Sequence, residues 1–107
     1  MPISPWYKTT HVTQTAPLWT ENIVTDSGTE NLFGLDDDDL SLFFTNTSNG
    51  VETQGAGTLH ITQANPGIVT YQVASADVVV GMYRVTLWIT FTNGPQPFLL
   101  GIWDVIA

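Results

Sequence analysis

The sequence has no cysteine and almost no positive charge. The absence of cysteine excludes disulfides, thiolate catalysis, and zinc or iron–sulfur sites with cysteine ligands. Only Lys8 and Arg84 are basic, against ten acidic residues, which gives a formal net charge of −8. Because nucleic-acid binding needs several lysines or arginines to neutralise phosphates, neither DNA nor RNA is an expected partner. Anionic membrane surfaces are disfavoured for the same reason.

Long apolar runs are lacking as well. No stretch approaches the roughly 20 apolar residues that a membrane-spanning helix needs. The opening segment, MPISPWYKTT, does not have the charged-then-apolar layout of a secretory signal peptide. We therefore expect a soluble chain that makes no membrane contact, is made in the cytoplasm and is not secreted by a signal peptide.

What the sequence does contain is a series of short segments rich in threonine, valine and aromatic residues. With 107 residues, 43% of them hydrophobic, the chain is long enough to bury a single core. No segment shows the 3.6-residue period of a helix, and polar turn signals separate the segments. The pattern predicts an all-β protein, an immunoglobulin-like antiparallel β-sandwich of residues 8–107, preceded by an extended N-terminal arm of residues 1–7. The predicted strands are residues 8–14, 17–24, 40–46, 57–62, 67–73, 80–92 and 98–106.

One local motif supports the immunoglobulin-like class. Gly81 and Tyr83 open the penultimate strand, and Asp77 lies a few residues upstream in a predicted helical turn. Immunoglobulin-like sandwiches often carry a tyrosine at this corner, where its hydroxyl bonds to backbone upstream. Val85 stands where antibody domains have a cysteine, so apolar packing replaces the disulfide. We therefore assign structural roles to Asp77, Gly81 and Tyr83.

A series of turn and strand elements follows in a distinctive order along the second half of the sequence. These elements are Gly57-Thr58, Thr62-Gln63-Ala64, Gly67, Tyr71, Ala76-Asp77, Gly81, Tyr83, Phe91 and Asn93-Gly94. Their order resembles that of the N-terminal, immunoglobulin-like domain of the baseplate upper protein of tailed phages, and the likeness covers roughly residues 15–106. The resemblance implies a structural role in a phage particle, with the virion as location and other virion proteins as partners. Family members continue into further domains, whereas this sequence ends after its last strand, so we expect an accessory module of the capsid exterior, neck or tail.

Candidate catalytic groups are few. His11 and His60 alternate with apolar neighbours, so both are expected to point outward, and no nucleophile signature accompanies them. No glycine-rich loop follows a strand to hold a phosphate. The spacing of the acidic residues places no pair of carboxylates together for glycoside hydrolysis. We expect neither an enzyme nor a bound cofactor.

The run of four aspartates at residues 36–39 is the candidate for a metal site. Clustered carboxylates suit Ca²⁺, and Asp36, Asp38 and Asp39 are the weak candidate ligands. The run lacks the glycine and the glutamate at the EF-hand positions, and adjacent acids repel one another. A solvated loop that deters edge pairing is the favoured interpretation, so no metal is expected.

Two aromatic residues do not fit the alternation of their strands. Trp88 lies between threonines on the polar side of its strand, and Phe43 lies on the corresponding side of strand 40–46. A third, Trp6, precedes the first strand on the arm. Exposed apolar patches of this kind mark interfaces. The alternative is that Trp88 lies beneath a loop or against the N-terminal arm.

The last strand poses the same problem. Leu100 and Ile102 alternate against Trp103, so regular alternation does not allow one core to take both sets. We predict an interface formed by Trp6, Phe43, Trp88, Leu100 and Ile102. The predicted function is that of a non-enzymatic phage virion protein that docks on other virion proteins and on copies of itself. The alternative is a carbohydrate- or receptor-binding module, with Trp88 or Trp103 stacking on sugar rings of a host-surface glycan.

Overall fold

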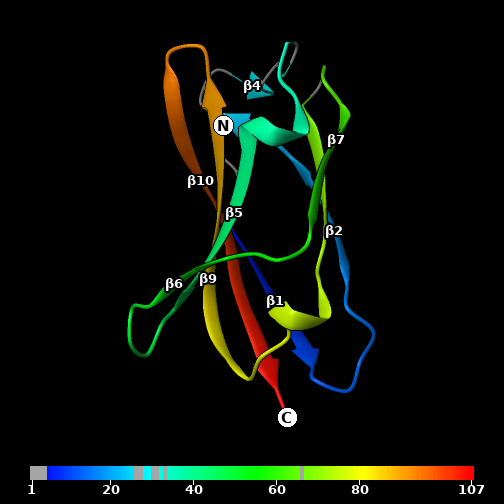
Figure 1. Cartoon of the computed structure of the whole chain (residues 1–107), viewed down its shortest axis with the longest axis vertical. Coiled ribbons are helices and arrows are strands. Elements are labelled where there is room, and N and C mark those ends of the chain that lie inside the picture. The colour runs from blue at the N-terminus through cyan, green and yellow to red at the C-terminus, as the bar shows by residue number, and fades with distance from the viewer. Residues whose placement is uncertain (1–4, 26–27, 30–31, 33, 66) are drawn as a thin grey trace.

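The computed structural model describes residues 5–25, 28–29, 32, 34–65 and 67–107, and these residues fold into two packed β-sheets (Figure 1). A five-stranded sheet has the order β1-β10-β9-β5-β6, and a three-stranded sheet has the order β2-β8-β7. Strands β3 and β4 form a separate hairpin. In chain order the elements are β1 (Trp6–His11), β2 (Leu18–Asn22), β3 (Val24–Thr25), β4 (Gly28–Thr29), the 3-10 turn η1 (Asp37–Asp39), β5 (Leu40–Asn46), β6 (Glu52–Gln54), β7 (Thr58–Gln63), β8 (Ile68–Gln72), the 3-10 turn η2 (Ser75–Asp77), β9 (Gly81–Phe91) and β10 (Gly94–Ile106).

The two sheets form the predicted all-β, immunoglobulin-like sandwich. All pairings are antiparallel except that of β1 with β10, which is parallel. Strands β5 and β9 alternate between buried and partly or fully exposed residues along their central parts, as expected when one face of a sheet packs on a second sheet. The sequence pattern therefore specified the fold class correctly.

Aromatic rings fill the middle of the core. The rings of Trp19 on β2 and Trp103 on β10 meet edge to face across the sheets, with centroids 5.0 Å apart. Trp103 is fully buried, and its Nε1–H donates a hydrogen bond to Thr10 Oγ1 at 3.0 Å. Phe44 packs against both Tyr71 and Trp103, at centroid distances of 6.2 and 5.3 Å. These contacts join the two sheets without a disulfide.

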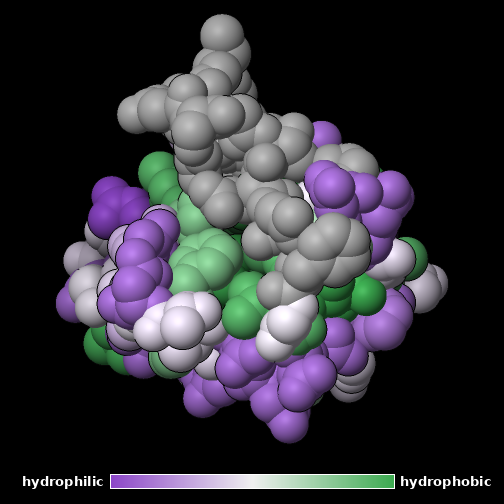
Figure 2. Space-filling model, turned by 90° about the horizontal axis from the view of Figure 1, so that it is seen from above, coloured by the Kyte–Doolittle hydropathy of each residue, from purple (hydrophilic) through white to green (hydrophobic). Residues whose placement is uncertain are grey.

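The core extends to the end of the molecule at which the β9–β10 hairpin turns. Figure 2 looks onto this end and shows apolar residues gathered in the middle with hydrophilic ones around them. Phe91 and Phe98 belong to this hairpin, have centroids 6.4 Å apart, and pack against the core. The residues at 93–97, predicted as a turn, instead belong largely to β10, which begins at Gly94.

A β-bulge in β10 corrects the prediction for Leu100. The register with β9 shifts between Leu99 and Gly101, so one extra residue turns toward the core. Leu100 and Trp103 are therefore both buried, with exposed fractions of 1% and 0%. The assignment of Leu100 to an interface is wrong, because that assignment assumed regular alternation through the bulge.

The predicted N-terminal arm is also corrected. Trp6 and Tyr7 belong to β1 and pair with Gly101 and Ile102, whereas residues 1–4 lie outside the described residues. The Trp6 ring packs on Trp19 at 5.2 Å and its Nε1–H donates to Glu21 Oε1 at 3.0 Å. Trp6 is thus a partly buried residue of β1 and not part of a free arm, and its assignment to an interface stays a prediction.

The tyrosine corner is confirmed. Tyr83 Oη–H donates a hydrogen bond to the carbonyl oxygen of Val79 at 2.8 Å, four residues upstream. Gly81 has a φ of +153°, and a Cβ there would lie 3.0 Å from Tyr83 Oη. Asp77 anchors a neighbouring network: its carboxylate accepts hydrogen bonds from Tyr71 Oη at 2.5 Å and from the N–H groups of Ala56 and Ala74 at 2.8 and 3.0 Å. The loop before β9 is therefore fixed as the sequence predicted.

Candidate docking face

The outer face of the five-stranded sheet carries a row of apolar side chains. On β9 the core takes Val85, Leu87 and Ile89, which are at most 1% exposed, so the even-numbered residues face outward. Residues that pair across adjacent strands point to the same face. Trp88 pairs with Ser41 of β5 and Pro97 of β10, and the next row is Phe43, Thr86 and Leu99. The bulge then brings Ile102 to this face, beside Tyr7 of β1.

We call this row the outer apolar strip; it consists of Tyr7, Phe43, Trp88, Pro97, Leu99 and Ile102. Tyr7 is 61% exposed and Leu99 is 42% exposed. Phe43, Trp88 and Ile102 are partly buried, yet none of the three is among the side chains that pack against the core. Phe43 and Trp88 are diagonal neighbours on adjacent strands, about 7–8 Å apart, whereas Ile102 lies opposite Arg84, further along β9 from Trp88. The sequence misfits at Trp88 and Phe43 thus correspond to side chains directed away from the core.

The N-terminal strand does not cover Trp88. Strand β10 separates β1 from β9, and Trp6 packs on Trp19 at the inner face of the sheet. The alternative in which Trp88 lies against an N-terminal arm therefore does not hold for the described part of β1. Trp103 faces inward and is fully buried, so it is excluded as a sugar-stacking residue.

Charges of both signs surround the outer apolar strip. Exposed Arg84 lies between Thr45 and Ile102 on this face, and Glu52 lies on the other side of Thr45. Tyr7 Oη–H donates to Asp104 Oδ2 at 2.9 Å, and this hydrogen bond raises the pKa of Tyr7 above its usual value. A partner that covers this apolar strip can therefore also form hydrogen bonds and ion pairs with the charged groups at its border.

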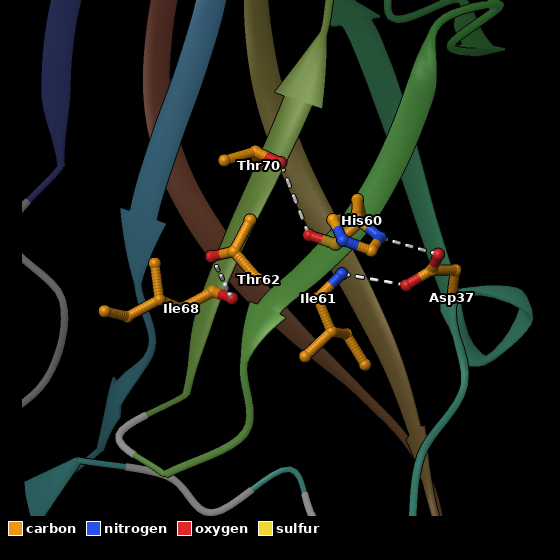
Figure 3. Close-up of polar contacts among 6 residues, drawn as sticks. All are labelled: Asp37, His60, Ile61, Thr62, Ile68 and Thr70. Atoms are coloured by element: carbon orange, nitrogen blue, oxygen red, sulfur yellow. Dashed lines mark hydrogen bonds and ion pairs between the residues drawn. The ribbon is translucent and has the colours of Figure 1, made fainter.

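The acidic run before β5 has a structural role at its second aspartate. Asp37 Oδ2 pairs with His60 Nδ1 at 2.9 Å, and Asp37 Oδ1 accepts the backbone N–H of Ile61 at 2.8 Å (Figure 3). The hydrogen bond with His60, followed by that with Ile61, lowers the pKa of Asp37 below its usual value. His60 points outward, as predicted, and this contact ties η1 to the edge of β7. Sequence spacing did not reveal the pair, because 23 residues separate its members.

The three weak metal candidates are not gathered into a site. Asp39 Oδ2 accepts the backbone N–H of Asp36 at 2.9 Å, a bond that closes the 3-10 turn. Asp38 is exposed on the outside of that turn. Among the residues that the structure describes, no group of three or more histidine, cysteine, aspartate or glutamate side chains is arranged to hold a metal ion.

Glu21 is the carboxylate most deeply buried in the described core, and it is already engaged. It is 9% exposed, and burial raises its pKa, opposed by the hydrogen bond from Trp6 and by the charge of Lys8. The Lys8 ammonium lies 4.9 Å from the centre of the Trp6 ring. Glu21, Trp6 and Lys8 therefore form a structural contact between β2 and β1.

The fold and this face define the class of protein: an immunoglobulin-like β-sandwich with an apolar outer sheet face. No protein-family model matches the chain, and comparisons with curated proteins and with solved structures find no match. No helix in the described ranges is long and apolar enough to cross a membrane.

Proposed function

We propose that the protein is a non-enzymatic structural component of a bacteriophage virion that docks through the outer apolar strip on other virion proteins and on copies of itself. The observation that supports docking is the outward row centred on Trp88. The virion assignment draws on the likeness of the sequence to the phage baseplate upper-protein domain. The net charge of −8 would keep free copies apart until the strip meets its partner.

The energetics favour a partner over solvent. Full burial of a large apolar side chain from an exposed state is worth about 1.5–3 kcal/mol, so covering the partly buried Trp88 and Phe43 contributes a fraction of that from each. Trp88, Phe43 and Leu99 lie on three adjacent strands, so one flat partner surface can cover all three. Aromatic residues at the centre of such a surface dominate binding energy, which makes Trp88 the expected anchor.

Light scattering after size-exclusion chromatography tests self-association. The wild-type chain should form oligomers at high protein concentration, and Trp88→Ser should shift it to monomer. Leu18→Ser is the matched control, because Leu18 is 61% exposed on the outer face of the other sheet. A wild-type chain that stays monomeric, or a Leu18→Ser variant that dissociates equally, contradicts self-docking through the strip.

The virion assignment has its own test. Purified particles of the phage that encodes the chain should contain it at a fixed copy number, located by immunolabelling on the head, neck or tail. Its absence from purified particles contradicts the assignment whatever the oligomeric state.

A carbohydrate- or receptor-binding module is the second candidate, favoured by Trp88 alone among the tryptophans. Its ring lies beside the hydroxyls of Ser41 and Thr86, which suits stacking and hydrogen bonding to a sugar. A glycan array should then show binding that Trp88→Ser abolishes. Glycan binding by a monomeric wild-type chain would favour this candidate over self-docking.

A further inference from the structure

A groove runs along one side of the sandwich, away from the outer apolar strip. It has a volume of about 390 Å³ and lies between Leu40–Leu42 of β5 and Thr58–Leu59 of β7. η1 borders one end, and the Gly55–Gly57 connection, which crosses from β6 to β7, borders the other (Figure 1). The groove therefore lies where the edges of the two sheets face each other.

Both walls of the groove are strand edges without a neighbouring strand. β6 pairs with β5 along Phe43–Thr45 and not along Leu40–Leu42. There the Leu40 N–H donates to the Asp37 carbonyl and the Leu42 carbonyl accepts the Gly55 N–H, so the Leu40 carbonyl and the Leu42 N–H are the groups left without a strand partner. β7 is the edge of the three-stranded sheet. In the described ranges no strand pairing joins β5 to β7. Unpaired edges present rows of backbone donors and acceptors that can template another strand.

Two hydrogen bonds show which way these edges point. The Leu42 carbonyl accepts the Gly55 N–H at 2.8 Å, and the Ile61 N–H donates to Asp37 Oδ1 at 2.8 Å. Alternate residues of a strand direct their backbone groups to the same edge. The Leu40 carbonyl and both backbone groups of Leu59 therefore face the groove between these two occupied positions, whereas the Leu40 N–H is taken by the Asp37 carbonyl.

The far end of the groove is preorganised. Tyr71 Oη accepts a hydrogen bond from the Gly57 N–H at 2.9 Å and donates one to Asp77. These two bonds fix the Gly55–Gly57 connection against the Tyr71 ring. A Cβ on Gly57 would collide with Tyr71 and with the Gln72 carbonyl, so this close approach requires glycine. A fixed wall reduces the ordering cost of binding.

Another free edge of the molecule is blocked, which sets the groove apart. Within the described ranges β1 pairs with Gly101–Ile106, and no described strand pairs with that side of the earlier part of β10. Pro95 and Pro97 occupy that part and have no N–H to offer an added strand. The walls of the groove contain no proline.

We propose that this groove binds a short extended peptide segment of a partner protein as an added strand, with a lysine or arginine placed against Asp38. An extended backbone offers hydrogen-bonding groups on alternate sides, so a segment that pairs with Leu59 on the edge of β7 still has donors and acceptors for the free groups on the β5 side. Exposed Asp38 and the neighbouring Asp37 line one end, which favours a basic side chain there. This site is independent of the outer apolar strip.

Amide NMR of the ¹⁵N-labelled full chain tests the proposal. The probe is the blocked peptide acetyl-Thr-Val-Lys-Val-Thr-amide, and the control probe is the same peptide with both valines N-methylated. The amides of Leu42 and Leu59 should shift most, saturating below about 10 mM, and N-methylation should weaken binding about tenfold or more. Asp38→Asn should weaken binding about two- to fivefold, the size expected for one exposed ion pair.

Leu18→Ser, on the opposite face of the second sheet, should bind the peptide as the wild type does. Equal binding of the N-methylated peptide, shifts centred outside the groove, or no saturation at about 10 mM would each overturn the proposal. Equal binding of free lysine would assign the groove to a small polar ligand instead and would overturn it too. None of these outcomes bears on oligomerisation through Trp88, so the two proposals fail separately.

Discussion

The two outer faces of the sandwich differ sharply although they enclose the same core. The outer face of the three-stranded sheet is polar apart from Leu18 and Ile68; its other paired members are Thr20, Asn22, Thr58, His60, Gln63, Thr70 and Gln72. The outer face of the five-stranded sheet, by contrast, carries two large aromatic side chains, Trp88 on β9 and Phe43 on β5. An antiparallel sheet needs only one apolar face to fold. The fold therefore does not require apolar residues on the outer face of the five-stranded sheet. Because leaving them in contact with water is unfavourable, we infer that this face binds a partner.

The largest predicted difference in stability is between substitutions of the inward-facing Trp103 and of the outward-facing Trp88, which lie on opposite sides of the five-stranded sheet. Trp103→Ala should lower the free energy of unfolding by about 3–5 kcal/mol, because it removes a fully buried ring and leaves Thr10 without its donor. Trp88→Ala should cost about 1 kcal/mol or less, since its ring faces outward. Urea denaturation of the monomeric proteins measures both. Equal losses would mean that Trp88 belongs to the core.

A smaller effect should distinguish the inner and outer tyrosines. Tyr83→Phe removes the hydrogen bond to the Val79 carbonyl and should cost about 1 kcal/mol. Tyr7→Phe removes a solvent-exposed bond to Asp104 and should leave the unfolding temperature essentially unchanged. Thermal unfolding of the two variants compares them directly. A larger loss for Tyr7→Phe would contradict the role of Tyr83 as the anchor of the β9 corner.

The smallest effect concerns the polar sheet and depends on pH. The pKa of Asp37 is lowered in the folded state, so its contribution to stability is present above the unfolded value near 3.9 and is lost as the pH falls through the lowered pKa. Asp37→Asn should therefore lower the urea midpoint at about pH 6, and the difference from wild type should shrink at about pH 3. Asp38→Asn, which leaves the contacts of Asp37 with β7 in place, is the control. A pH-independent difference would show that the Asp37 charge plays no part.

Local patterns in the sequence predicted the features that depend on neighbouring residues. Alternation identified the long strands and placed Trp88 and Phe43 on the outward side. The spacing of Gly81 and Tyr83 predicted the corner, because the residues that form it are four positions apart or fewer. Such features are determined before any long-range contact is known.

The features that the sequence did not reveal depend on register or on distant pairing. Gly101, with a φ of +156°, marks the bulge locally, but a strand glycine does not tell which of its neighbours turn toward the core, here both Leu100 and Trp103. The sequence around Trp6 predicts an arm and not a strand, because the strand with which Trp6 pairs lies at the other end of the chain. Two prolines near the start of β10 resembled a turn, but they are compatible with a strand at the sheet edge that β1 leaves unpaired.

The parallel pairing of β1 with β10 has a mechanical consequence. The chain leads into β1 at the level of Gly101 and leaves β10 at Ile106, with six residue pairs between these two points. Tension applied at both ends would pull the two strands lengthwise past each other. All six pairs would then bear the load together in shear, instead of opening one after another as in a zipper. A sandwich clamped in this way resists stretching along the axis of its terminal strands.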